Sequence, residues 1–141
     1  MAYEGINLYQ CFSKLFPWTH SQVIVVSGTF PNPCGHAILN AGGVGGHYFH
    51  IAGDGNDRPY YMDEAGYRRC LKENRKTELQ RKSIKITKPD AMQRKFDELA
   101  SQDWLWGVLP HNCATFVETL VKAGGSDTGL YTNCPALEDW K

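Results

Sequence analysis

The alternation of hydrophobic and polar residues along the chain predicts a set of short β-strands. The first is an apolar, β-branched run typical of a buried strand, and the next two flank a glycine-rich turn, as in a β-hairpin. Two further strands have weaker patterns. The expected strands are residues 22–26, 35–41, 47–53, 58–62 and 83–86.

Four segments instead have their apolar residues at helical spacing or carry helix-boundary signals. Pro17 ends the first, and Pro89 with Asp90 begins the third. Asn112 is the expected N-cap of the last helix, which Gly124 and Gly125 terminate. The expected helices are residues 7–16, 63–74, 87–102 and 112–123.

Length and composition predict one domain. The chain has 141 residues with 42% hydrophobic content, enough for a core without disulfides or metals, so we expect a single domain over residues 1–141. The formal net charge is zero, and no nucleic-acid partner is expected. No apolar run approaches the roughly 18 residues of a membrane span, and no basic leader precedes an apolar stretch. Synthesis in the cytoplasm without a signal peptide is expected.

The charge is unevenly distributed. Between Arg68 and Lys88, nine basic residues face only Glu73 and Glu78, which leaves that stretch near +7. Two interpretations stay open: a solvated charged face, or a rim that faces an anion.

Cys113 is the strongest candidate for a chemical role. Five scattered cysteines without a C-x-x-C pair predict reduced thiols rather than a disulfide framework or zinc knuckle. Cys113 directly follows the expected cap Asn112, and a helix N-terminus lowers the pKa of a thiol because its unpaired N–H groups favour negative charge. A small buried residue in a packed helix is the structural alternative.

Two histidines upstream favour the catalytic interpretation. A thiolate nucleophile needs an imidazole to exchange its proton, and a third polar group usually orients that imidazole. His36 and His50 lie on adjacent expected strands, where a hairpin can bring them side by side.

These motifs resemble those of the circularly permuted papain-like group, which includes NlpC-type hydrolases and lecithin retinol acyltransferase-like enzymes. NCATFV at residues 112–117 is similar to the cysteine-helix motif of the group, and GHAIL at residues 35–39 resembles its histidine strand. In that group the histidine precedes the cysteine, the reverse of papain. The resemblance implies an α+β fold in which an antiparallel sheet packs against helices and the nucleophile lies at a helix N-terminus.

By position, the resemblance implies that Cys113 is the nucleophile, His36 the general base and acid, and His50 the orienting residue. His47 competes with His50, although strand alternation sends their side chains to opposite faces. His47, His111, Trp104 and Trp106 are expected at the substrate.

The resemblance further implies cleavage of an amide bond through a thioester, with no cofactor. The expected substrate is a peptidoglycan peptide, and the expected protein an amidase or endopeptidase acting as a bacterial effector toxin. A toxin of this kind would be exported into a target cell by a dedicated system. It would have an immunity protein as its partner. Two alternatives stay open: a phospholipid acyltransferase or thiol lipase, and a non-catalytic binding domain that retains the fold. A metal is not expected, because His47 and His50 diverge on a strand.

Overall fold

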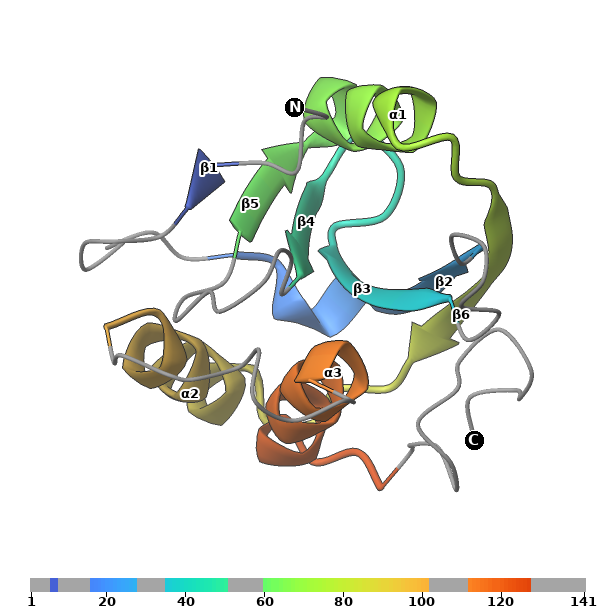
Figure 1. Ribbon diagram of the computed structural model, residues 1–141. Helices are drawn as coiled ribbons and strands as arrows, with labels where there is room; N and C mark the ends of the chain where they lie inside the picture. Colours follow the sequence, from blue (N-terminus) through green and yellow to red (C-terminus); the bar gives the residue numbers. More distant parts are fainter. Residues whose placement is uncertain (1–5, 8–15, 28–34, 51–59, 102–111, 128–141) are drawn as a thin grey trace.

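The strands form one antiparallel sheet in the computed structural model, which describes residues 6–7, 16–27, 35–50, 60–101 and 112–127 (Figure 1). The sheet has six strands in the order β1-β5-β4-β3-β2-β6, so β2 to β5 form a meander and β6 pairs with the outer side of β2. The strands are β1 Ile6–Asn7, β2 Ser21–Val26, β3 His36–Ala41, β4 His47–His50, β5 Tyr60–Asp63 and β6 Glu78–Ile84.

Helices cover both faces of this sheet (Figure 1). Helix α1 (Glu64–Glu73) lies on one face, whereas α2 (Pro89–Ser101) and α3 (Asn112–Ala123) lie on the other, together with the short 3₁₀ helix η1 (Trp18–His20). The expected α+β class, with an antiparallel sheet packed against helices, is confirmed. Among the described helices, none has both the length and the apolar character that crossing a bilayer requires.

Strand alternation divides the core into two apolar clusters. Neighbouring residues of β3 illustrate the division, because Leu39 faces α2 and α3 while Ile38 faces α1. The cluster beneath α2 and α3 includes Val23, Leu39, Phe49, Phe96 and Phe116. The cluster beneath α1 includes Ile24, Ile38, Tyr48, Met62 and Tyr67.

The predicted glycine-rich turn joins β3 to β4. Asn40 is fully buried and fixes the turn, since its Nδ2 donates to the carbonyls of Gly43 (2.9 Å) and His47 (3.2 Å), and its Oδ1 accepts from the Gly43 N–H (2.7 Å). Gly42, Gly43 and Gly45 all have positive φ angles of 71° to 95°, which glycine adopts without steric cost. Residues 51–53, the expected end of the second strand, lie outside the described residues.

A network of two buried tyrosines and three partly exposed charged side chains links α1 to the sheet. The rings of Tyr48 and Tyr67 stack at 4.1 Å, and the Arg81 guanidinium lies over both. Arg81 also pairs with Glu78 (2.9 Å), Tyr67 Oη donates to Glu78 (2.7 Å), and Tyr48 Oη donates to Glu64. Burial and the bond to Glu64 raise the pKa of Tyr48 to about 12, so its hydroxyl remains a donor.

Two expectations from the sequence need correction. The expected helix over residues 7–16 is wrong at both described ends: Asn7 pairs with Tyr60 as part of β1, and Phe16 lies outside any helix, packed edge-on against Trp18 and Phe96. Residues 8–15 lie outside the described residues. The last strand, expected at residues 83–86, spans Glu78–Ile84 instead. Its first five residues are mostly polar, so the apolar alternation that marks a strand is missing there.

Helix α3 ends as its glycines predict. The Ser126 N–H donates to the Val121 carbonyl (2.9 Å) and the Gly125 N–H to that of Lys122 (3.0 Å), with Gly125 at φ 95°. These are the two bonds of a Schellman motif. The Gly124 carbonyl accepts from the Thr87 N–H (2.9 Å), which ties the end of α3 to the start of α2.

We predict that Gly125→Ala lowers the free energy of unfolding by about 2 to 4 kcal/mol, because the left-handed conformation and a steric clash both oppose a side chain. An added Cβ would lie 2.2 Å from Thr87 Oγ1. Gly45→Ala is the matched control: Gly45 has φ 84° with open space around it, so only the backbone term of about 1 to 2 kcal/mol applies. Urea unfolding measures both, and equal losses would contradict this account.

Candidate active site

The structure brings His36 and His50 together. His36 is the first residue of β3 and His50 the last residue of β4, and His36 Nε2 lies 2.7 Å from His50 Nδ1. The ring centroids are 5.0 Å apart at 74°. His50 is 2% exposed and His36 is partly exposed, so the pair has one buried member and one that other groups can reach.

Burial keeps the His36 ring neutral. Desolvation lowers the pKa of His36 well below its ordinary value of 6.5, and the nearby His50 and the Lys76 charge lower it further. A neutral imidazole can accept a proton, which an imidazolium cannot.

The contact to His50 determines which ring nitrogen of His36 can accept a proton from a substrate or nucleophile. When Nε2 carries the proton and donates to His50 Nδ1, the lone pair of His36 Nδ1 is available for a substrate or nucleophile proton. No residue in the described part of the chain makes a hydrogen bond to that Nδ1. The pair therefore has the arrangement of a base and its orienting partner.

His47 lies on the opposite face of the sheet from this pair. Its Nδ1 is 2.7 Å from Tyr61 Oη, and its ring packs edge-on against Phe16 at 4.9 Å. The alternation expected along this strand is confirmed, and His50 rather than His47 contacts His36.

Cys113 is the second residue of α3, but its side chain lies outside the described part of the structure. The apolar residues of α3, such as Phe116 and Leu120, pack on the face of the sheet opposite to His36. A thiol on the first turn of α3 can meet the His36 ring only around the end of β3, where His36 is the terminal residue. His111, Trp104 and Trp106 lie outside the described residues.

Two neighbours of the pair were not singled out from the sequence. Tyr60 is the cross-strand partner of His50, with ring centroids 6.0 Å apart. Lys76, in the segment between α1 and β6, donates through Nζ to the Ser27 carbonyl at 3.2 Å and lies near His36. Lys76 is 40 positions from His36 in sequence, where it is one lysine of a long basic stretch; no local pattern marks it.

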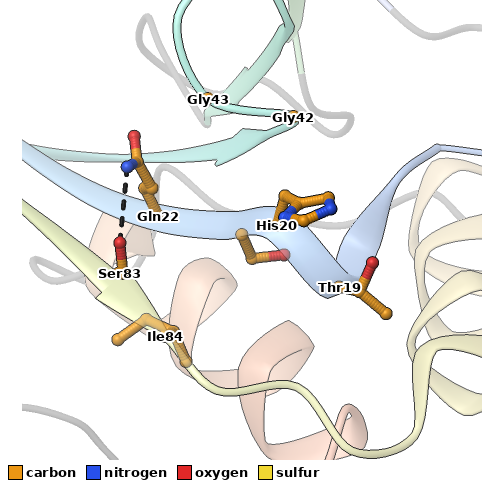
Figure 2. Close-up of a pocket in the computed structure, with 8 residues that line it drawn as sticks. Thr19, His20, Gln22, Gly42, Gly43, Ser83 and Ile84 are labelled. Carbon is orange, nitrogen blue, oxygen red and sulfur yellow. Dashed lines mark hydrogen bonds between the residues drawn. The ribbon is translucent and has the colours of Figure 1, made fainter.

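A hollow of about 270 Å³ lies elsewhere, between η1, the start of β2 and the end of β6 (Figure 2). Its polar lining includes Thr19, His20 and Ser83. The hollow lies where β2 pairs with the end of β3, five positions and roughly 17 Å along the strand from the Val26 and His36 pair. It is separate from the histidine pair. Across the described ranges, no three His, Cys, Asp or Glu side chains cluster in a way that could hold a metal ion.

Comparison with known proteins does not extend this picture: no family model matches the chain, and neither a curated protein nor a solved structure matches it significantly. The class that the structure itself defines is an α+β domain with an antiparallel sheet and a part-buried histidine pair at one end of its central hairpin.

The neutral state of His36 predicts a stability that depends on pH. The folded-state pKa lies below 6.5, whereas the unfolded residue titrates near 6.5, so the unfolded chain binds the proton first as the pH falls. Stability is complete above pH 6.5 and decreases below it, by up to about 1.4 kcal/mol per pH unit. Burial raises the pKa values of Glu64 and Glu78, but hydrogen bonds and nearby arginine charges together lower them below the ordinary value, so the stability that these carboxylates contribute is lost only at lower pH.

Urea unfolding between pH 5 and 8 measures this effect, and His36→Gln should flatten the profile between pH 5 and 6.5. The matched control is His20→Gln, because His20 is exposed and distant from the pair. Parallel profiles for the wild type and His36→Gln would show that His36 is not held neutral by the fold.

Proposed function

We propose that this protein is a cysteine hydrolase that cleaves an amide bond through a thioester intermediate. Cys113 is the proposed nucleophile, His36 the general base and acid, and His50 the residue that orients His36. The observation that carries the proposal is the 2.7 Å contact between His36 Nε2 and His50 Nδ1, which leaves His36 Nδ1 to exchange a proton with a thiol. The position of Cys113 in the first turn of α3 supports it, since a helix N-terminus stabilises a thiolate.

The proposed reaction proceeds in two halves. His36 Nδ1 takes the thiol proton as the sulfur attacks the amide carbonyl, and backbone N–H groups at the start of α3 stabilise the oxyanion. The C–N bond breaks as His36 returns the proton to the leaving amine, which gives a thioester. His36 then takes a proton from water as the water oxygen attacks the thioester. The C–S bond breaks, the carboxylic acid leaves, and the thiol regains a proton.

The substrate we propose is a peptide of peptidoglycan, with the protein acting as a bacterial effector toxin that an immunity protein would block. This choice follows from the resemblance of the GHAIL and NCATFV motifs to those of permuted papain-like enzymes. The lipid branch of the same group makes phospholipids the substrate to test in parallel, because the same thiol and imidazole pair transfers acyl groups from esters.

Cys113→Ala is expected to abolish hydrolysis, since the proposed thioester forms on its sulfur. Purified protein is incubated with muropeptides and, separately, with phospholipid vesicles, and products are measured by chromatography and mass spectrometry. Cys70→Ala is the matched control: Cys70 lies on the buried face of α1, and its replacement should change stability but not chemistry. Activity that survives in Cys113→Ala would refute the nucleophile, and inactivity of the wild type on both substrates would favour a binding domain.

Substitution of the two histidines of β4 should lower the activity to different extents. His50→Ala is expected to lower kcat/KM by about 10²-fold to 10⁴-fold, because His36 loses the partner that fixes its tautomer. His47→Gln should lower it far less, because His47 faces Tyr61 on the other side of the sheet. Thermal unfolding of each variant shows how much of any loss of activity comes from a loss of folded protein. A larger loss of activity for His47→Gln would overturn the assignment of His50.

A further inference from the structure

The hollow between η1, the start of β2 and the end of β6 has the size of a small-ligand site. Its volume of about 270 Å³ lies just below the roughly 300 to 1,000 Å³ of pockets that take drug-sized ligands. It therefore fits a molecule the size of a single six-membered ring with its substituents. Of its lining residues, Thr19, His20 and Ser83 are exposed, whereas Ser21 and Ile84 are buried. A ligand can enter this hollow from solvent.

Two side chains of the hollow keep their hydrogen-bonding groups available. Among the residues that the structure describes, neither the Thr19 hydroxyl nor the His20 ring has a hydrogen-bond partner. The backbone of His20 is nevertheless fixed, because its N–H donates to the Pro17 carbonyl (3.0 Å) and its carbonyl accepts from the Gly42 N–H (3.0 Å). In Figure 2 the His20 ring lies between Thr19 and Gln22. The hollow thus presents a hydroxyl and an imidazole on a fixed backbone.

Gln22 and Ser83 add an oriented amide and a second hydroxyl. Arg81 Nη1 donates to Gln22 Oε1 (2.8 Å), which fixes the direction of the amide. Gln22 Nε2 then faces Ser83 Oγ at 3.4 Å, a long hydrogen bond (Figure 2). Within the described ranges the Ser83 proton has no acceptor, so this hydroxyl can donate to a ligand.

These groups favour a neutral ligand over an anion. The described lining contains no lysine, arginine, aspartate or glutamate. Backbone N–H groups of a glycine turn can hold an anion, but here they are already used. The Gly42 N–H donates to the His20 carbonyl (3.0 Å), and the Gly43 N–H donates to Asn40 Oδ1 (2.7 Å). Hydroxyl, amide and imidazole groups can each donate and accept, as the hydroxyls of a neutral ligand do.

We propose that this hollow binds a neutral sugar ring. The lining hydroxyls, amide and imidazole bond to the hydroxyls of the sugar, and Ile84 contributes apolar surface for its C–H groups. The site goes beyond the proposed hydrolase chemistry, because it lies roughly 17 Å along β2 from the histidine pair and uses neither histidine. Such a ring has two sources with the same chemistry: a free saccharide, or the sugar of a muropeptide.

NMR titration of the full chain with N-acetylglucosamine tests the site. The amide signals of the lining residues, such as Gln22, Gly43 and Ser83, should shift, with a Kd on the order of 1 mM for so small a ligand. Inorganic phosphate is the anionic comparison and should leave these signals unchanged. No shift of these amides at sugar concentrations far above that Kd, or a response to phosphate alone, would overturn the proposal.

Two substitutions and a matched control locate the binding. Ser83→Tyr, at an exposed position of β6 where tyrosine suits a strand, should fill the hollow and weaken sugar binding about tenfold or more. Thr19→Val replaces one hydroxyl by a methyl group and should weaken it about threefold to tenfold, the effect of one hydrogen bond. Thr77→Val makes the same change at an exposed residue near Ser27, at the other end of β2, and should leave the Kd unchanged. Equal effects of the two valine substitutions would show that the sugar binds elsewhere.

A muropeptide distinguishes the two sources of the sugar. The titration uses Cys113→Ala, so that the muropeptide is not cleaved. If the substrate sugar occupies the hollow, the muropeptide should bind about tenfold or more tightly than N-acetylglucosamine and should also shift the signals of His36 and His50, because two linked contacts act together. Equal affinities, with shifts confined to the hollow, support a site for free saccharides. If neither compound shifts the lining residues, the sugar site is wrong and the hydrolase proposal stands.

Discussion

The register between β3 and β4 is the constraint on which the rest of the candidate site depends. Leu39 pairs with Phe49, so His36 and His50 point to the same face and their rings can meet. A slip of one residue would turn His50 to the other side of the sheet and bring His47 to the face of His36. The buried Asn40 side chain and the left-handed glycines of the turn hold this register.

The two faces of the sheet serve different purposes. The face beneath α2 and α3 is almost entirely apolar and forms the larger cluster of the core. The face beneath α1 instead combines a small apolar cluster with the stacked Tyr48 and Tyr67 rings, the Arg81 ion pair and the histidine pair. Polar groups that are bonded to one another in a network hold their positions closely, which suits the side of the sheet that presents His36.

The features that the sequence predicted well are those with strong local signals. The hairpin came from two strand-like segments around a glycine-rich turn, α2 from its proline and acidic start, and α3 from its asparagine and paired glycines. The features it predicted poorly have their cause in distant contacts. Asn7 is in a strand because β5 offers an edge, and β6 begins at Glu78 because the edge of β2 pairs with it over its whole length, although most of its side chains are polar.

The sequence by itself determined the α+β class, the hairpin, the opposite orientation of His47 and His50, and Cys113 as a residue of the first turn of a helix, because periodicity and capping act over a few residues. Only the tertiary structure decided that His36 and His50 touch, that burial keeps His36 neutral, and that Lys76 lies beside them. These properties depend on which strands pair and on how α1 ends. Lys76 and His36 are 40 positions apart, so no local pattern distinguishes Lys76 from the other basic residues around it.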